Sequence, residues 1–373
     1  MDSEKGKLHL IDSLATDIRC SSEGQQFNKR IDRYSTAKNF AVGNYKYIRD
    51  NVAQSNKVRK VSAALRDCGS YLVFNHYFTT GEIKLTKASL CKKHLLCPLC
   101  AIRRGSKTLG AYMSKFTVIM ASNSSLKAYM VTLTVKDGDD LQERVSHLRN
   151  SWVKYTKNRK RPSCDFETKK IDSLVYSIEV KRGKKSNLWH PHMHSVWLSE
   201  DIPNQDKLSK EWHSITGDSF IVDVREITPD DPIKGFLEVF KYAVKFSSQA
   251  PEDTWHCFKK LSGVRLLNPM GGFRGTKEEE PLDEEEDLPS IELFFKWFGK
   301  KYMFVNKETM NKELDSENLK TNKSYFENDV RESKTIQEIE DLARIKNANK
   351  WDISRQIKHE FSDKNKSLQK KQI

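Results

Sequence analysis

The sequence contains no long hydrophobic run, and this absence limits where the protein can act. No window approaches the roughly 18 apolar residues that a membrane-spanning helix needs. The N-terminal stretch MDSEKGKLHLIDSLATDIRC has no basic segment followed by an apolar one, so it does not resemble a secretory signal. We therefore expect a cytoplasmic protein that does not cross a membrane.

Cysteine is also scarce. The chain has seven cysteines, an odd number, and no secretory signal accompanies them. Both features argue against a disulfide framework, and the clustered cysteines are better interpreted as metal ligands. A phosphate-binding loop of the form GxxxxGK followed by Ser or Thr is missing as well, so the chain shows no nucleotide-hydrolysis motif of that kind.

Basic residues, in contrast, are abundant. The 373 residues include 65 Lys and Arg against 51 Asp and Glu, which gives a formal net charge of +14, and 37% of the chain is hydrophobic. This length and composition are sufficient to bury a core. The positive charge suits a polyanionic partner, but by itself it does not distinguish nucleic acid from an acidic membrane surface.

Composition divides the chain into four predicted segments. They are a polar and basic N-terminal region at 1–65, a cysteine module with a basic helix at 66–125, a central domain at 126–275, and a C-terminal part at 276–373. We expect residues 1–45 to be loosely structured and a helix to follow at 45–65. The C-terminal part holds an acidic run expected to be a solvated loop, an aromatic segment expected to lie in the core, and a polar tail expected to be partly helical and otherwise disordered.

The central domain has the pattern of an α+β fold. Strand-like alternation and helical spacing succeed one another in the order strand 128–135, helix 139–157, strand 173–180, strand 190–198, helix 204–215, strand 219–227 and helix 232–248. This is the βαββαβ order of a ferredoxin-like, split-βαβ sheet, with one helix added. We therefore predict an α+β protein whose central domain is built on that sheet.

Four cysteines upstream of this domain form a candidate metal site. The C-x-x-C pair Cys97 and Cys100 follows Cys91 and Cys68, and four thiolates can close a tetrahedral zinc site. His94 is a possible substitute ligand. A reduced cluster without metal and a redox C-x-x-C are the alternatives, and we favour a structural zinc site. The other cysteines are expected to be unligated thiols, namely Cys20, Cys164 and Cys257.

The strand WHPHMHSVWL carries three histidines at alternate positions. His190, His192 and His194 should therefore face the same side of the sheet, where two imidazoles can bind one divalent ion. Glu179 on the preceding strand would lie beside them if the intervening loop closes a hairpin. Nitrogen and oxygen ligands with open positions suit Mn²⁺ or Mg²⁺. The alternative is a set of polar side chains on a hydrated face, and His190 is the least certain ligand because it begins the strand.

The helix at 232–248 carries a polar stripe. Glu238, Lys241, Tyr242 and Lys245 recur at helical spacing, so we expect them to share one face. A phenol is a weak nucleophile near its ordinary pKa of about 10, but a polarised phosphate, nearby lysines and a base would favour attack by its oxygen. The alternative is a surface stripe in which Glu238 only pairs with the lysines.

Taken together, these motifs resemble the HUH endonucleases, specifically rolling-circle plasmid replication initiators of the pC194/pUB110 type. The matching features are the strand AYMVTLTV, the histidine strand, the stretch EVFKY and the upstream cysteines, in that family's order. The resemblance covers about residues 66–275. It implies a ferredoxin-like split-βαβ palm, the HUH endonuclease core, with a zinc-binding cysteine module before it and a polar C-terminal extension after it.

The resemblance also implies an activity. Mg²⁺ or Mn²⁺ held by His192 and His194, with Glu179, would polarise a phosphate of plasmid origin DNA, and Tyr242 would attack to leave a 5′-phosphotyrosine and a free 3′-OH. Glu238 would activate water to end the cycle. His190, Lys241 and Lys245 are candidate contacts to DNA or phosphate.

The resemblance further implies a host helicase and DNA polymerase as partners, and it leaves the oligomeric state open. A single-tyrosine HUH transposase, a mobilisation relaxase and a zinc-containing DNA-binding regulator that does not cleave are the alternatives. The upstream cysteine module and the E-x-x-x-Y spacing favour the replication initiator over the other two enzymes.

Overall fold

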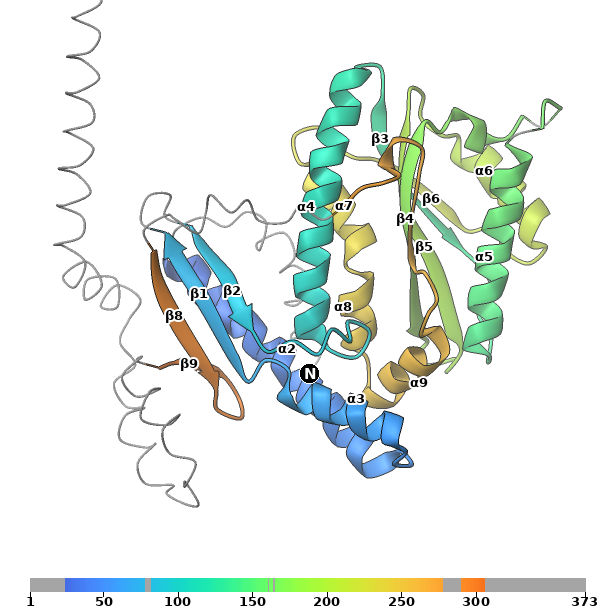
Figure 1. Ribbon diagram of the computed structural model, residues 1–373. Coiled ribbons are helices and arrows are strands. Elements are labelled where there is room, and N and C mark those ends of the chain that lie inside the picture. Colours follow the sequence, from blue (N-terminus) through green and yellow to red (C-terminus); the bar gives the residue numbers. More distant parts are fainter. Residues whose placement is uncertain (1–23, 78–81, 160, 164, 278–289, 306–373) are drawn as a thin grey trace, which may run out of the picture.

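A computed structural model of the chain describes residues 24–77, 82–159, 161–163, 165–277 and 290–305 (Figure 1). Several predicted features lie outside these residues, namely the first part of the N-terminal region, Cys20, Cys164, the acidic run and the polar tail. The described part is a mixed α+β structure with two antiparallel sheets. Among its helices, none is sufficiently long and apolar to cross a membrane.

The larger sheet has five strands in the order β6-β3-β5-β4-β7, and every neighbouring pair is antiparallel. The strands are β3 (Lys127–Thr134), β4 (Ser173–Arg182), β5 (Trp189–Ser199), β6 (Val222–Glu226) and β7 (Leu267–Met270). With α5 (Leu141–Asn158) after β3 and α6 (Gln205–Thr216) after β5, the chain follows the βαββαβ order. The predicted order of elements is therefore confirmed.

Alternation along these strands decides which side chains meet. In the β4–β5 pair, Glu179 lies opposite His192, and in the β3–β5 pair Thr132 lies opposite His194. Residues directly opposite each other in an antiparallel pair share a face of the sheet. The histidines, Glu179 and Thr132 therefore project to one side, which we call the histidine face.

Helices cover both sides of this sheet (Figure 1). On the histidine side, α7 (Pro232–Phe240) packs on β4 and β5, and α4 (Pro98–Ser122) packs against α7. The other side is covered by α5 and α6, where Trp152 lies 6.3 Å from Trp197 between ring centroids. Asp140 and Asn204 cap α5 and α6 by accepting a hydrogen bond from a backbone N–H in the first turn of each helix.

The polar stripe lies on two short helices, whereas the sequence predicts one helix from 232 to 248. The first is α7, and the second is α8 (Tyr242–Ser247). Lys241 joins them with φ −79° and ψ −3°, so its ψ is well away from the helical value of about −42°. The interruption is small, because Lys241 donates to the backbone oxygen of Leu237 and accepts from the backbone N–H of Lys245.

A second sheet of four strands has the order β2-β1-β8-β9. Its strands are β1 (Tyr71–Tyr77), β2 (Ile83–Ala88), β8 (Ser290–Trp297) and β9 (Tyr302–Phe304). Leu293 and Phe295 of β8 are buried, which confirms the core position expected for these two aromatic-segment residues. Because β8 pairs with β1, this sheet crosses the predicted segment boundary at 276, and the boundaries themselves stay a prediction.

The N-terminal region contains two helices, α2 (Gly24–Asn51) and α3 (Asn56–Asp67). The expectation of loose structure up to residue 45 is therefore wrong for residues 24–45. Phe27 packs edge-on against Phe74 of β1, with 5.0 Å between ring centroids. The sequence signal was weak because the buried face of α2 includes small and polar side chains such as Ala37, Lys38 and Asn44.

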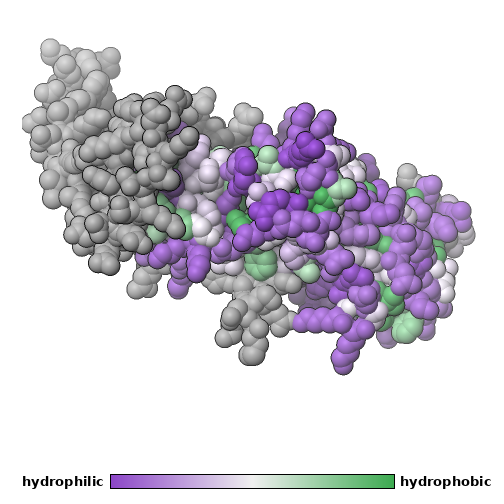
Figure 2. Space-filling model, turned by 90° about the horizontal axis from the view of Figure 1, so that it is seen from below, coloured by the Kyte–Doolittle hydropathy of each residue, from purple (hydrophilic) through white to green (hydrophobic). Residues whose placement is uncertain are grey.

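The remaining described elements are α9 (Pro251–Leu261) and two 3₁₀ turns at Glu167–Lys170 and Gly271–Phe273. Figure 2 shows the molecule from below, with a hydrophilic surface over most of the described residues and only scattered hydrophobic ones. Isolated apolar residues on a surface are normal and do not indicate a docking site. On this face, polar side chains therefore form most of the surface that a partner could contact.

Candidate active site

Four cysteine thiols converge between α2, β1 and the start of α4. The sulfur of Cys68 lies 3.5 Å from that of Cys97 and 3.6 Å from that of Cys100, and Cys91 lies 3.6 Å from Cys100. Zn–S bonds of about 2.3 Å in a tetrahedron place sulfurs about 3.8 Å apart, so the spacing suits one ion. In the part of the chain that the structure describes, this is the one group of three or more Cys, His, Asp or Glu whose ligand atoms all lie within 4.8 Å of one another. The cluster could hold a metal ion such as zinc.

The backbone around the cluster supports thiolate ligands. Gly69 and Lys92 each follow a cysteine and have φ of 65° and 57°, which turns the chain sharply. The backbone N–H of Cys91 donates to the sulfur of Cys68 at 3.3 Å, and that of Lys93 donates to the sulfur of Cys91 at 3.5 Å. Such donors stabilise the anionic sulfur that a metal requires.

His94, the possible substitute ligand, lies outside this cluster. Its Nδ1 is 3.2 Å from Nη1 of Arg104 on α4. Burial, reinforced by the charge of Arg104, lowers the pKa of His94 to about 4. The ring is therefore neutral at pH 7 and accepts a hydrogen bond from the guanidinium, while four cysteines make up the cluster.

The histidine face presents three imidazoles in a row. The rings of His190 and His192 are stacked with 5.7 Å between centroids, and those of His192 and His194 with 6.1 Å. His190 is the most exposed, and its Nε2 lies 3.5 Å from Oδ2 of Asp137. The hydroxyl oxygen of Thr132 lies 3.2 Å from Nδ1 of His194. The row is therefore oriented by polar neighbours on adjacent segments.

Glu179 is the charged centre of this face and is fully buried. Its Oε2 lies 3.3 Å from Nε2 of His194 and contacts the ammonium of Lys245, while the ammonium of Lys181 is 3.2 Å from Oε1. Burial acts to raise the pKa of Glu179, but the His194 hydrogen bond and the two lysine charges outweigh it, so the pKa lies well below its usual range. The group is a carboxylate at neutral pH.

The donor set on this face fits a divalent cation. Burial lowers the pKa of His192 to about 4, so its imidazole is neutral and able to act as a ligand at pH 7. Oε1 of Glu179 is buried and makes no hydrogen bond to the described residues, and the Lys181 ammonium forms an ion pair with it at 3.2 Å. Two imidazoles and a carboxylate suit Mn²⁺ or Mg²⁺, although their ligand atoms do not all lie as close together as the four sulfurs do.

One side chain of the polar stripe reaches this carboxylate, and two others lie beside it. Lys245 contacts Glu179, Lys241 contacts Glu238, and the Lys245 ammonium is 4.0 Å from Oε2 of Glu238. The alternative of ion pairing within the stripe is thus present for Glu238. These contacts also place Glu238 beside Lys245, the lysine that contacts Glu179.

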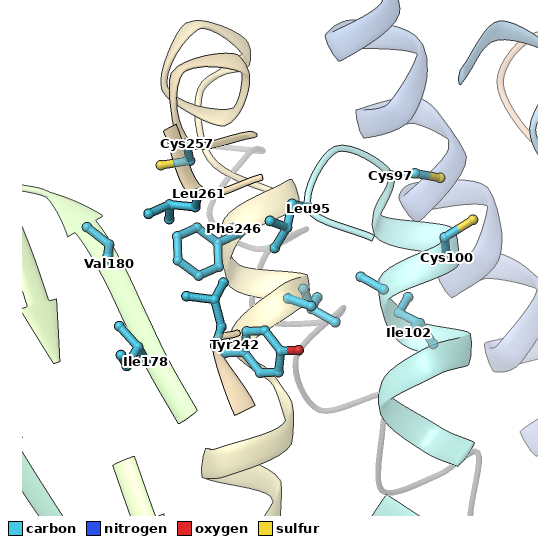
Figure 3. Close-up of a cluster of buried hydrophobic side chains, with 14 of the residues drawn as sticks. Leu95, Cys97, Cys100, Ile102, Ile178, Val180, Tyr242, Phe246, Cys257 and Leu261 are labelled. Atoms are coloured by element: carbon cyan, nitrogen blue, oxygen red, sulfur yellow. The ribbon is translucent and has the colours of Figure 1, made fainter. Parts of the chain in front are cut away.

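Tyr242 does not share this arrangement, which corrects the expectation that all four residues lie on one face. Its side chain is 6% exposed and lines a cavity with Arg104 and Tyr112 of α4. Figure 3 shows its hydroxyl directed towards α4 and away from Ile178 and Val180 of β4. The aromatic ring is more stable when buried, and it packs in the hydrophobic core with its hydroxyl at the cavity.

The electrostatic setting of Tyr242 keeps its phenol protonated. Burial raises the pKa of Tyr242, and the nearby charge of Arg104 opposes that shift. Sequence reasoning did not assign Arg104 to this site, nor Thr132 and Asp137 to the histidine row. Thr132 is identified by the register of the β3–β5 pair, in which it lies directly opposite His194.

Comparison with known proteins identifies the family to which this chain belongs. A family model described as "Replication protein" matches residues 82–293, which is more than half of the chain. The chain belongs to this family of replication proteins. The matched region contains Glu179, the histidine strand and the α7–α8 stripe, together with three of the four clustered cysteines; Cys68 precedes it.

One relative extends the comparison. "Protein rep" from Lactiplantibacillus plantarum is 22% identical over 275 residues, which cover 66% of this chain and 84% of the relative. No solved structure matches the chain. The family and this relative support a role in the initiation of plasmid replication.

Proposed function

We propose that the protein is a plasmid rolling-circle replication initiator that nicks origin DNA and transfers the strand through a 5′-phosphotyrosine. The observation that carries this proposal is the buried carboxylate of Glu179 beside His192 and His194, faced by a helix pair that carries Glu238 and Tyr242 in a replication-family chain. The strand order and the histidine row support an HUH-type palm. Family membership favours replication over transposition or mobilisation.

His192, His194 and Glu179 are the residues that would hold Mg²⁺ or Mn²⁺. When bound, the ion would supply Lewis-acid polarisation of the scissile phosphate. Lys245 now neutralises Glu179, so its ammonium would have to give way to the ion or turn towards the DNA. Exposed His190 and the two stripe lysines would contact the DNA backbone, and the four cysteines would hold a structural zinc ion.

Tyr242 is the proposed nucleophile. Its oxygen forms a bond to phosphorus, the bond from phosphorus to the 3′ oxygen breaks, and the proton that leaves the phenol is balanced by one that the departing 3′ oxygen takes up through water to become a hydroxyl. The 3′-OH can then prime synthesis by the host polymerase, with a host helicase separating the strands. To reach a phosphate on the histidine face, the side chain would rotate out of the cavity where the structure places it.

Glu238 is the proposed base for the closing step. Its side chain is 41% exposed, so water has access to it, and Lys241 and Lys245 keep it in the site. A glutamate in this position can take a proton from the water that attacks the phosphotyrosine. Nicking and release would thus use different residues of one helix pair.

The first test is incubation of the full chain with Mn²⁺ and a supercoiled plasmid that carries its own gene. We expect an open-circle product with protein covalently attached. Tyr242→Phe should abolish nicking and the adduct, whereas Tyr71→Phe, at a tyrosine on the smaller sheet, should retain both. Glu238→Ala should nick but release poorly, and His192→Ala should lose metal-dependent cleavage.

Each result can contradict part of the proposal. Nicking by Tyr242→Phe would reject the nucleophile, and equal loss of nicking in Tyr242→Phe and Glu238→Ala would reject the division of roles. Cleavage by His192→Ala with added Mn²⁺ would reject the ligand role. Retarded migration of the plasmid without any nick would instead indicate a DNA-binding regulator.

A further inference from the structure

A cavity of about 410 Å³ lies between α4, α8 and the chain at 263–267. Its volume is within the range of sites that hold small ligands. The Tyr242 and Tyr112 rings line it, with Ala111, Leu266 and Leu267 adding apolar surface. This cavity is separate from the polar cluster around Glu179.

The cavity has a positive lining. Arg104 and Arg265 both border it and are both exposed to solvent, and none of its lining residues is acidic. Neither guanidinium forms an ion pair with a carboxylate of the described residues; Arg104 bonds to His94, and Arg265 donates to the backbone oxygen of Leu267. Two uncompensated guanidiniums at one small cavity favour a phosphate ligand.

The aromatic lining is held rigidly. The Tyr112 ring packs against Phe240 with 5.1 Å between centroids and against Phe273 with 5.8 Å. Tyr112 is 5% exposed, so its ring forms part of the wall of the cavity. The phosphate of a nucleotide can meet the two guanidiniums while its nucleoside contacts this apolar and aromatic wall. The cavity thus has the chemistry for one nucleotide.

We propose that this cavity holds the nucleotide whose 5′-phosphate has become joined to Tyr242, an inference that rests on the proposed tyrosine chemistry. A phosphate on the tyrosine oxygen must lie next to that oxygen, and the structure directs this side chain into the cavity. Arg104 and Arg265 bind the phosphate, and the wall to which Tyr112 belongs contacts the nucleoside.

The position of Tyr242 in the cavity separates the phosphotyrosine from Glu238. Glu238, the proposed base for release, contacts Lys241 and approaches Lys245 beside Glu179, whereas the Tyr242 hydroxyl faces α4 (Figure 3). With its linked nucleotide in the cavity, the phosphotyrosine is held away from that base. The covalent intermediate therefore persists until the tyrosine turns back.

Binding of a free 5′-phosphate end tests this inference without the origin sequence. The probes are single-stranded oligothymidylates of about ten nucleotides, labelled at the 3′ end, with either a 5′-phosphate or a 5′-hydroxyl. The full chain without added Mg²⁺ or Mn²⁺ is titrated, and fluorescence anisotropy gives both affinities. We expect the 5′-phosphorylated probe to bind about tenfold more tightly.

Arg104→Gln and Arg265→Gln should each remove most of this preference, and Arg104→Lys should keep part of it. Arg149→Gln is the matched control, because Arg149 is an exposed arginine of α5 on the other side of the sheet. Thermal unfolding of every variant verifies that the chain is folded.

Equal binding of the two probes by the wild type would overturn the inference, even if the plasmid is nicked. A loss in Arg104→Gln no larger than in Arg149→Gln would overturn it as well. The proposed function fails separately, through the absence of a Tyr242-dependent nick. A protein that prefers the 5′-phosphate but never nicks would therefore reject the tyrosine chemistry and keep only the phosphate site.

Discussion

At the residue scale, the pair formed by Lys245 and Glu179 dominates the site. The carboxylate is fully buried, and the lysine side chain is 11% exposed. A buried charge that loses its partner costs far more than a surface ion pair contributes. The same ammonium also occupies a position next to the carboxylate oxygens that a divalent cation would use.

Lys245→Met should therefore destabilise the protein by about 3 kcal/mol in the absence of added Mn²⁺. Added Mn²⁺ should then raise the unfolding temperature of this variant more than that of the wild type, because the cation replaces the missing positive charge. Thermal unfolding with and without Mn²⁺ measures both effects. Lys181→Met is the control, since that lysine is 57% exposed and its loss should cost at most about 1 kcal/mol.

An unchanged unfolding temperature in Lys245→Met, with no additional response to Mn²⁺, would contradict this account of the pair. If Mn²⁺ raised the unfolding temperature of Lys181→Met by as much, the stabilisation would come from the general surface charge and not from the Lys245–Glu179 pair. Either result would mean that the Lys245–Glu179 pair does not determine the response to Mn²⁺, and it would leave the proposed role of the histidine strand untouched.

The positions of the site residues were predictable to different degrees. His192 and His194 could be placed on one face from alternation alone, because side chains along a strand have a period of two residues. Glu179 could be placed beside them only on the condition that the intervening loop closes a hairpin, which the β4–β5 pairing satisfies. Tyr242 could not be placed in this way. Its direction depends on the burial of its ring and on the packing of α8 against α4.

At the scale of single elements, helix α4 connects the cysteine cluster with the cavity that Tyr242 lines. It begins directly after Cys97, contains Cys100, and continues to Arg104 and Tyr112 of the cavity. Because a helix is rigid over a few turns, the cysteine cluster fixes the position of these two cavity residues. A metal ion in the cluster would then stabilise the cavity without contacting a ligand.

Cys100→Ser should remove bound zinc, lower the free energy of unfolding by at least about 3 kcal/mol, and weaken the preference for a 5′-phosphate end. Elemental analysis gives the zinc content, and chemical unfolding gives the stability. Cys257→Ala is the control, because that buried cysteine lies outside the cluster and its variant should keep its zinc. Full zinc content in Cys100→Ser would contradict the assignment of this thiol as a ligand.

Elements differed in how far their sequences predicted them. The strands β3, β4 and β5 have strong alternation and were found within one or two residues of their ends. The helix α2 was missed over much of its length because its buried positions include lysine and asparagine. Lys38 is buried since its ammonium donates to the backbone oxygens of Arg66 and Cys68, partners that no local pattern reveals.

At the scale of the whole molecule, the smaller sheet joins distant parts of the chain. The β8 strand pairs with β1 along its whole length, and the Tyr302 hydroxyl donates to the backbone oxygen of Gly69 at 2.7 Å. Gly69 directly follows the cluster residue Cys68. The C-terminal strands therefore support the cysteine cluster from more than 200 residues away in sequence.

Phe295 should be essential to this arrangement. Its ring lies 5.7 Å from that of Phe27 and 5.8 Å from that of Phe74, so Phe295→Ala should lower the free energy of unfolding by about 3–5 kcal/mol. Phe294→Ala, on the other face of the same strand, should cost much less because that ring is only partly buried. Urea unfolding compares the two, and equal losses would show that the packing against α2 and β1 is not what holds β8.

The sequence by itself determined the order of the central elements, the common direction of the histidines and the four cysteines of the cluster, because each depends on local periodicity or spacing. Only the tertiary structure decided that Tyr242 faces a cavity lined by Arg104 and Arg265, while Lys245 faces Glu179. Both outcomes depend on packing between α4, α8 and β4, which are separated by many residues in the chain. Local patterns carry no information about such contacts, since the burial that selects them exists only when the chain is folded.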